Sequence, residues 1–158
     1  MELGQILALL GAALAVICSG VGSSKSVGAA GETASAVVSE NPEVAGKLMV
    51  LQLLPATQGI YGFLIAVIVL IKVNILGGAM YDVSITQGLQ ILVGCLPIAI
   101  VGLLSAIYQG KVASSAMITT GEHPELSGRG ITMTVMVETY AVLSLLVSFL
   151  VLNSIVLG

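Results

Sequence analysis

Four long stretches of the chain contain no aspartate, glutamate, lysine or arginine. They are Leu3–Ser24, Leu48–Ile71, Val83–Gly110 and Thr139–Gly158. A helix needs about 20 mostly apolar residues to cross a hydrocarbon core about 30 Å thick. Only 8% of the 158 residues are charged, whereas soluble domains have about 25%. A water-soluble globule of this size could not cover itself with so few charges, so we predict an integral, multi-pass membrane protein.

The predicted fold is an all-α membrane protein with four transmembrane helices in two helical hairpins. The first hairpin occupies residues 1–81, with spans over about 4–39 and 46–76, and the second occupies residues 82–158, with spans over about 84–120 and 128–157. Little chain remains for a water-soluble domain. Glu2 replaces the basic start of a secretory signal, so we expect the first span to be retained.

The two hairpins are predicted to be duplicates. The loop Glu40–Glu43 recurs as Glu122–Glu125, 82 positions later. In the first span of each hairpin, the best match pairs Lys25 with Lys111, 86 positions later. The repeat is parallel, because an even number of spans separates the copies.

Small residues spaced four apart predict where helices pack closely in lipid. The stripes consist of Gly20, Ser24 and Gly28 in the first span and of Gly102, Ala106, Gly110 and Ser114 in the third. Such stripes suit contacts within one four-helix chain. They also suit a crowded inner circle of helices in a ring of many copies, and their presence on both odd-numbered spans favours the ring.

Glu138 lies inside the predicted fourth span. A charge at the centre of a bilayer costs about 2.5–3.5 kcal/mol even on the lenient insertion scale, and ionisable residues at this depth mark ion pathways. The plainer alternative is a protonated, hydrogen-bonded carboxyl near a helix end. Other polar groups in the spans favour the ion pathway.

Polar residues interrupt the second and third spans as well. Pro55 has no backbone N–H, so it is expected to kink the second span and free a carbonyl oxygen. Thr57, Gln58 and Tyr61 follow it on one side of the helix, and Gln109 lies deep in the third span. With Glu138, these groups form an oxygen-only set that suits a hard cation.

The balance of charge and ligands predicts which cation this set would hold. A single carboxylate balances a monovalent ion. A proton would need only the carboxyl and one or two hydrogen-bond partners, whereas this set offers several further oxygens. The set therefore favours Na⁺, with H⁺ as the alternative.

The segments that carry these groups resemble a known family. They are Leu53–Gly62, Gln109–Val112 and Met136–Ala141. Over essentially the whole chain, the sequence resembles the membrane-rotor subunit of V-type ATPases, called the proteolipid or subunit K, and especially its bacterial Na⁺-translocating branch. The family has glycine where this chain has Ala56, a position that supplies no ligand side chain.

The resemblance implies a set of site residues. The ion ligands would be the backbone carbonyl of Leu54 and the side chains of Thr57, Gln58, Gln109 and Glu138. Tyr61 would donate a hydrogen bond to Glu138 and lock the site. Each chain would then carry one ion, Na⁺ or H⁺, across the membrane.

The resemblance also implies partners. The chain would join a homo-oligomeric ring in a bacterial plasma membrane, surrounded by lipid, and turn against a static membrane subunit that carries an arginine. A central-stalk connector would dock on the loops at residues 40–45 and 121–127. Four basic residues lie toward these loops, so the loops are predicted to be cytoplasmic and the termini outside. They are Lys25, Lys47, Lys111 and Arg129.

Several function classes are not expected. Gly20–Lys25 lacks the spacing of a phosphate-binding loop, so ATP chemistry would belong to partner subunits. The net charge of −3 gives no reason to expect nucleic acid. A small four-helix multidrug exporter would need an aromatic chamber, but this chain has no tryptophan and two phenylalanines. A purely structural tetraspan would have no use for the polar set around Glu138.

Overall fold

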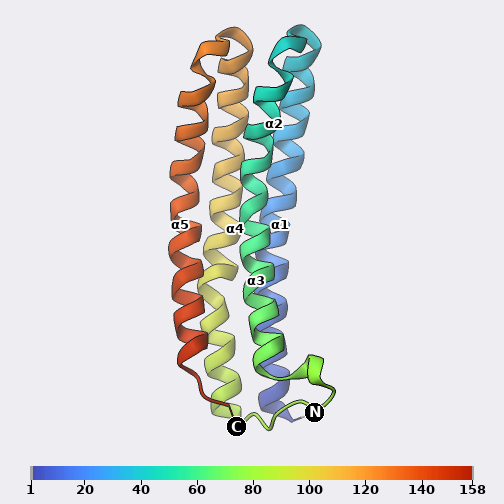
Figure 1. Cartoon of the computed structure of the whole chain (residues 1–158), viewed down its shortest axis with the longest axis vertical. Coiled ribbons are helices and arrows are strands. Elements are labelled where there is room, and N and C mark those ends of the chain that lie inside the picture. The colour runs from blue at the N-terminus through green and yellow to red at the C-terminus, as the bar shows by residue number, and fades with distance from the viewer. Residues whose placement is uncertain (1, 158) are drawn as a thin grey trace.

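The computed structural model describes residues 2–157, and these form an upright helical bundle (Figure 1). The helices are α1 (Leu3–Glu40), α2 (Ala45–Leu53), α3 (Thr57–Lys72), α4 (Ile85–Glu122) and α5 (Ser127–Ser154). Short 3₁₀ turns lie at Pro42–Val44, Leu54–Ala56, Ile75–Gly77 and Pro124–Leu126. No strand occurs among the described residues. Four helical segments are long and apolar enough to cross a membrane, which confirms the predicted all-α fold with four spans.

Both termini and the α3–α4 connection lie at one end of the bundle, and the other two connections lie at the opposite end (Figure 1). Two helix ends differ from the predicted spans. Helix α3 ends at Lys72, four residues early, because Asn74 adopts a left-handed backbone (φ 57°), a conformation that asparagine tolerates. Helix α5 ends at Ser154, and Ile155 is already extended (ψ 123°).

The duplication has one offset along the whole chain, so the predicted 86-residue offset for the first spans is wrong. Helices α1 and α4 are both 38 residues long, and their first and last residues are each 82 positions apart. The Ser23 hydroxyl donates to the carbonyl of Pro55, and 82 positions later Ser105 donates to the carbonyl of Val137. Lys25 and Lys111 therefore do not occupy equivalent positions.

Helices α1 and α4 share the most extensive contact in the bundle. Apart from Gln5, the buried residues of α1 are all glycine, alanine or serine. A Cβ atom added to Gly22 would lie 2.6 Å from the carbonyl oxygen of Leu103, and one added to Gly11 would lie 2.8 Å from the Cα of Leu92. The two backbones thus touch directly, as small residues permit.

The predicted stripe on α1 faces the wrong way for this contact. A Cβ on Gly20 or Gly28 would meet nothing within 4 Å, and Ser24 is exposed. The matching stripe on α4 is buried against α1, but it meets Ser19 and Ser26 instead. Small residues lie on both faces of α1, so spacing alone does not distinguish the inner face from the outer one.

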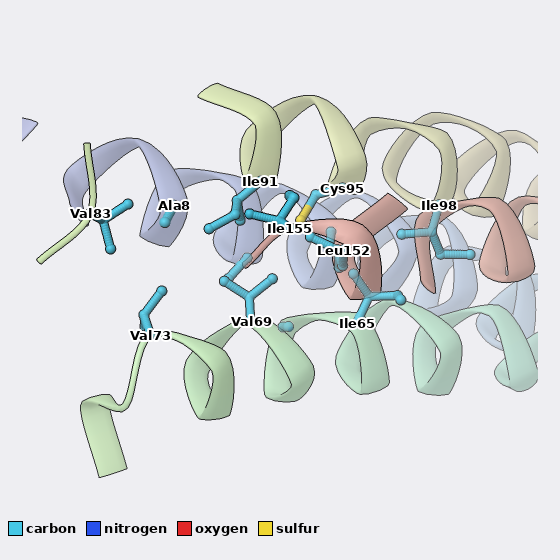
Figure 2. Packing of buried hydrophobic residues seen from close by; sticks show 13 residues of the cluster. Ala8, Ile65, Val69, Val73, Val83, Ile91, Cys95, Ile98, Leu152 and Ile155 are labelled. Atoms are coloured by element: carbon cyan, nitrogen blue, oxygen red, sulfur yellow. The ribbon is translucent and has the colours of Figure 1, made fainter. Parts of the chain in front are cut away.

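The buried apolar residues form two clusters separated along the bundle. In the cluster nearer the termini, Ile65 and Val69 of α3 point toward Ile91 and Cys95 of α4 (Figure 2). The second cluster lies toward the two connections at the other end and includes Leu48. The polar residues of the spans lie in the layer between the two clusters.

Candidate functional site

The site begins at the break between α2 and α3. The 3₁₀ turn Leu54–Ala56 separates the two helices, as predicted from Pro55, which cannot continue the helical hydrogen-bond ladder. The Thr57 hydroxyl donates to the carbonyl of Leu54 at 2.9 Å and lies 3.4 Å from Oε1 of Gln58. Three oxygen atoms, one from each residue, are thus gathered at the break.

Two glutamine side chains meet at the centre of the bundle. Gln58 and Gln109 are both fully buried, and Nε2 of Gln58 donates to Oε1 of Gln109. The same Nε2 contacts the hydroxyl of Ser105 at 3.4 Å. A buried amide costs free energy unless its polar atoms are paired, and among the described residues no buried side-chain nitrogen or oxygen atom lacks a partner.

Gln109 connects this pair to α5. Its Nε2 donates to the backbone carbonyl of Thr134 at 3.1 Å and to Oε2 of Glu138 at 3.5 Å. On the other side of the carboxylate, the Tyr61 hydroxyl donates to Oε1 of Glu138 at 2.5 Å. Glu138 is therefore held between α3 and α4.

No basic side chain neutralises Glu138. Within residues 2–157, the ion pair present is His123 with Glu125 at 3.4 Å, in an exposed loop. A carboxylate at membrane depth without a cationic partner is costly when ionised. The site therefore requires a bound cation or a proton to become neutral.

The donor atoms around Glu138 are all oxygens or amide groups. No group of three or more histidine, cysteine, aspartate or glutamate side chains that could hold a metal occurs in the described residues. Oxygen ligands with one negative charge suit a hard monovalent cation better than a soft transition metal.

The structure brings all six predicted residues into one network. They are Leu54, Thr57, Gln58, Tyr61, Gln109 and Glu138. Sequence reasoning missed Ser105 and Thr134, which support the two amides. Each lies four residues before a predicted member, Gln109 or Glu138, and therefore on the same helix face. That spacing could have found them.

The first hairpin has no equivalent site. The position 82 residues before Glu138 is Ala56, and the position 82 residues before Gln109 is Val27. Neither side chain can bind a cation. Each chain thus carries one carboxylate-centred network despite the duplication.

The two connections at the end opposite the termini contact each other. Asn41 Nδ2 donates to the carbonyl of Gly121 at 3.1 Å, and Lys47 Nζ donates to the carbonyl of Pro124 at 2.9 Å. These bonds hold the loops together as one surface. Its exposed carboxylates are Glu40, Glu43, Glu122 and Glu125.

Comparisons with known proteins place these features in context. The family model for the C-type subunit of ATP synthase matches twice, over residues 10–69 and 92–151, again 82 positions apart. The V-type sodium ATPase subunit K of Enterococcus hirae is 47% identical over 152 residues, covering 96% of this chain and 94% of that protein. The A-type ATP synthase subunit K of Methanocaldococcus jannaschii is 34% identical over 154 residues, covering 97% of this chain and 64% of that protein.

Proposed function

Because this chain belongs to the family of ATP synthase C-type subunits, we propose that it is a rotor-ring subunit of a V-type ATPase that binds and translocates Na⁺. The family assignment confirms the resemblance predicted from the sequence motifs. The observation that carries the proposal is the hydrogen-bond network that joins Gln58 and Gln109 to Glu138, a carboxylate without a cationic partner.

The proposed ligands are the oxygens already gathered in the network. The Leu54 carbonyl, the Thr57 hydroxyl and Oε1 of Gln58 form one side, and Gln109 and Glu138 form the other. Binding a cation requires the Gln109 amide to turn, because its oxygen now accepts from Gln58. Na⁺ is preferred over H⁺ because a proton would use none of the oxygens near Thr57.

Neutralisation of Glu138 explains how such a subunit can rotate in lipid. With Na⁺ bound, the carboxylate carries no net charge and can pass lipid at tolerable cost. Without the ion it is anionic and stays at a polar interface, where an arginine of a static membrane subunit displaces the ion. Each charge that crosses 100 mV exchanges about 2.3 kcal/mol with the field. ATP chemistry is assigned to partner subunits.

The proposed orientation follows the distribution of basic residues. Lys47 and Arg129 lie beside the two connections opposite the termini, whereas Lys72 and Asp82 offset each other at the other end. We assign the first end to the cytoplasm of a bacterial cell. The joined loops Glu40–Ala45 and Gly121–Ser127 are then the docking surface for a central-stalk connector.

A multidrug exporter remains the weaker alternative. The family matches cover most of both hairpins, and the buried centre of the bundle holds amides and hydroxyls instead of an aromatic chamber.

Carbodiimide labelling of Glu138 tests the proposal, since the reagent attacks the protonated carboxyl. In detergent-solubilised protein, we expect Na⁺ to protect Glu138 across a range of pH, and equal K⁺ not to protect it. Labelling that ignores Na⁺ and follows only pH would make this a proton-carrying subunit. Absence of labelling at every pH would refute the placement of the site.

Removal of the Tyr61 hydroxyl should weaken ion binding without unfolding the bundle. A hydrogen bond to a charged group contributes about 1.5–3 kcal/mol, which corresponds to about 10- to 150-fold in Kd. We expect Tyr61→Phe to raise the Na⁺ concentration for half-protection by that factor. Tyr81→Phe, in the α3–α4 connection, is the matched control. Equal protection in both variants would exclude a locking role for Tyr61.

A further inference from the structure

Two charged side chains on the long helices have no ion partner in the described part of the chain. Lys111 lies on α4 and contacts the ring of Tyr108, with Nζ 5.2 Å from the ring centroid. Glu32 lies on α1, and its carboxylate is exposed. No contact joins either residue to an opposite charge among residues 2–157. Both lie on helices whose remaining outer surface is largely apolar, which makes partners in an assembly worth seeking.

The duplication supplies a template for contacts between copies. Within the chain, Gly22 of α1 faces Leu103 of α4, with its added Cβ 2.9 Å from the Leu103 Cα. The residues 82 positions away are Leu104 on α4 and Val21 on α1. Those two side chains are 48% and 56% exposed. The equivalent contact is therefore unmade within one chain, although both of its faces are present.

A second contact repeats this pattern. Gly110 of α4 packs on Ser26 of α1, with its added Cβ 2.6 Å from the Ser26 Cβ. The equivalent residues are Gly28, which has open space around it, and Tyr108, which is 58% exposed. In each pair a small or apolar residue on α1 and a large one on α4 remain uncovered. The uncovered faces are complementary in the same way as the contact already made.

The charges follow from the same equivalence. A cavity of about 360 Å³ lies between α1 and α4, lined by residues that include Lys25, Ala29, Lys111 and Ser114. In a repeat of this groove between copies, Lys111 takes the place of Ala29, and Glu32 of the next copy takes the place of Ser114. The repeated groove thus holds a lysine and a carboxylate from different chains.

We propose that α4 of one copy packs on α1 of the next through the uncovered faces, and that Lys111 pairs there with Glu32. The inference rests on the proposed ring but adds which faces meet and which charges pair. The interface is heterologous, so each copy uses both faces and the assembly closes by rotation. Opposite charges at its edge fix the register of the helices and disfavour sliding.

Charge reversal tests the pair. Lys111→Glu and Glu32→Lys should each lower the temperature at which the purified assembly dissociates in detergent, because each places two like charges in one groove. The double variant should recover most of both losses. Additive losses in the double variant would overturn the pairing, and Lys72→Glu, at the other end of the bundle, controls for nonspecific effects of charge.

Disulfide cross-linking tests the packed faces independently. In a chain with Cys18→Ala and Cys95→Ala, the pair Val21→Cys and Leu104→Cys should give a ladder of covalent oligomers on oxidation. Each single-cysteine variant should give none. An equal mixture of the two single variants should stop at dimers, because a heterologous contact offers one cysteine to each neighbour.

The outcomes separate this inference from the proposed function. An assembly that still shows Na⁺-protected Glu138, but neither the ladder nor recovery in the double variant, would refute these faces and leave the ion-carrying role standing. A chain that remains monomeric in mild detergent and in liposomes would refute both the interface and the ring.

Discussion

Replacement of Glu138 by glutamine is expected to abolish Na⁺ binding and Na⁺ transport while leaving the bundle folded. Glutamine retains the size of the side chain and an oxygen that can accept from the Tyr61 hydroxyl. It removes the single negative charge of the network. Loss of one partner from a buried charge pair costs about 3–5 kcal/mol, which is at least a hundredfold in Kd.

The measurement is ²²Na⁺ uptake by liposomes that contain the whole ATPase, together with carbodiimide labelling of the isolated subunit. Glu138→Gln should lose both the uptake and the label. The matched control is Asp82→Asn, which removes an exposed carboxylate in the α3–α4 connection and should retain both. Normal uptake by Glu138→Gln would show that the ion pathway lies elsewhere.

Replacement of Gly62 by leucine is expected to disrupt the packing of α3 on α1. A Cβ at Gly62 would lie 2.4 Å from the carbonyl oxygen of Ala15 and 2.6 Å from the Cβ of Ser19. Overpacking costs about 1–3 kcal/mol, occasionally more. Here the obstacle includes backbone, which cannot rotate aside, so we expect a loss at or beyond the upper end of that range.

The thermal unfolding midpoint in detergent, followed by circular dichroism, measures this loss. Gly46→Leu is the control, because a Cβ there meets nothing within 4 Å. Na⁺ protection of Glu138 should also weaken in Gly62→Leu, since Gly62 adjoins Tyr61. An unchanged midpoint would contradict the close contact of α1 and α3.

The site was largely predictable because its signals are local. Pro55 interrupts a helix wherever it stands, and Glu138 is costly in any apolar span. The amides Gln58 and Gln109 were recognisable as polar residues within otherwise apolar runs. That these residues form a hydrogen-bonded network, and that Ser105 and Thr134 support it, depends on the rotation of α4 and α5 about their axes.

The register of the duplication was not predictable in the same way. Glycine, alanine and serine are frequent along both α1 and α4, so matches occur at more than one offset. The lysine pair favoured 86 positions, whereas the helix ends and the repeated hydroxyl bonds of Ser23 and Ser105 fix 82. Many weak matches of one composition carry little information about alignment.

The sequence by itself determined the four spans, the break at Pro55 and the one carboxylate that demands a cation. These follow from the cost of charges and unpaired backbone groups in lipid, which each segment meets alone. Only the tertiary structure decided which face of α1 is buried. In lipid no contrast in polarity separates a packed face from a free one. The choice between Gly22 and Gly20 therefore depends on how closely the backbone of α4 can approach, a property of two helices together.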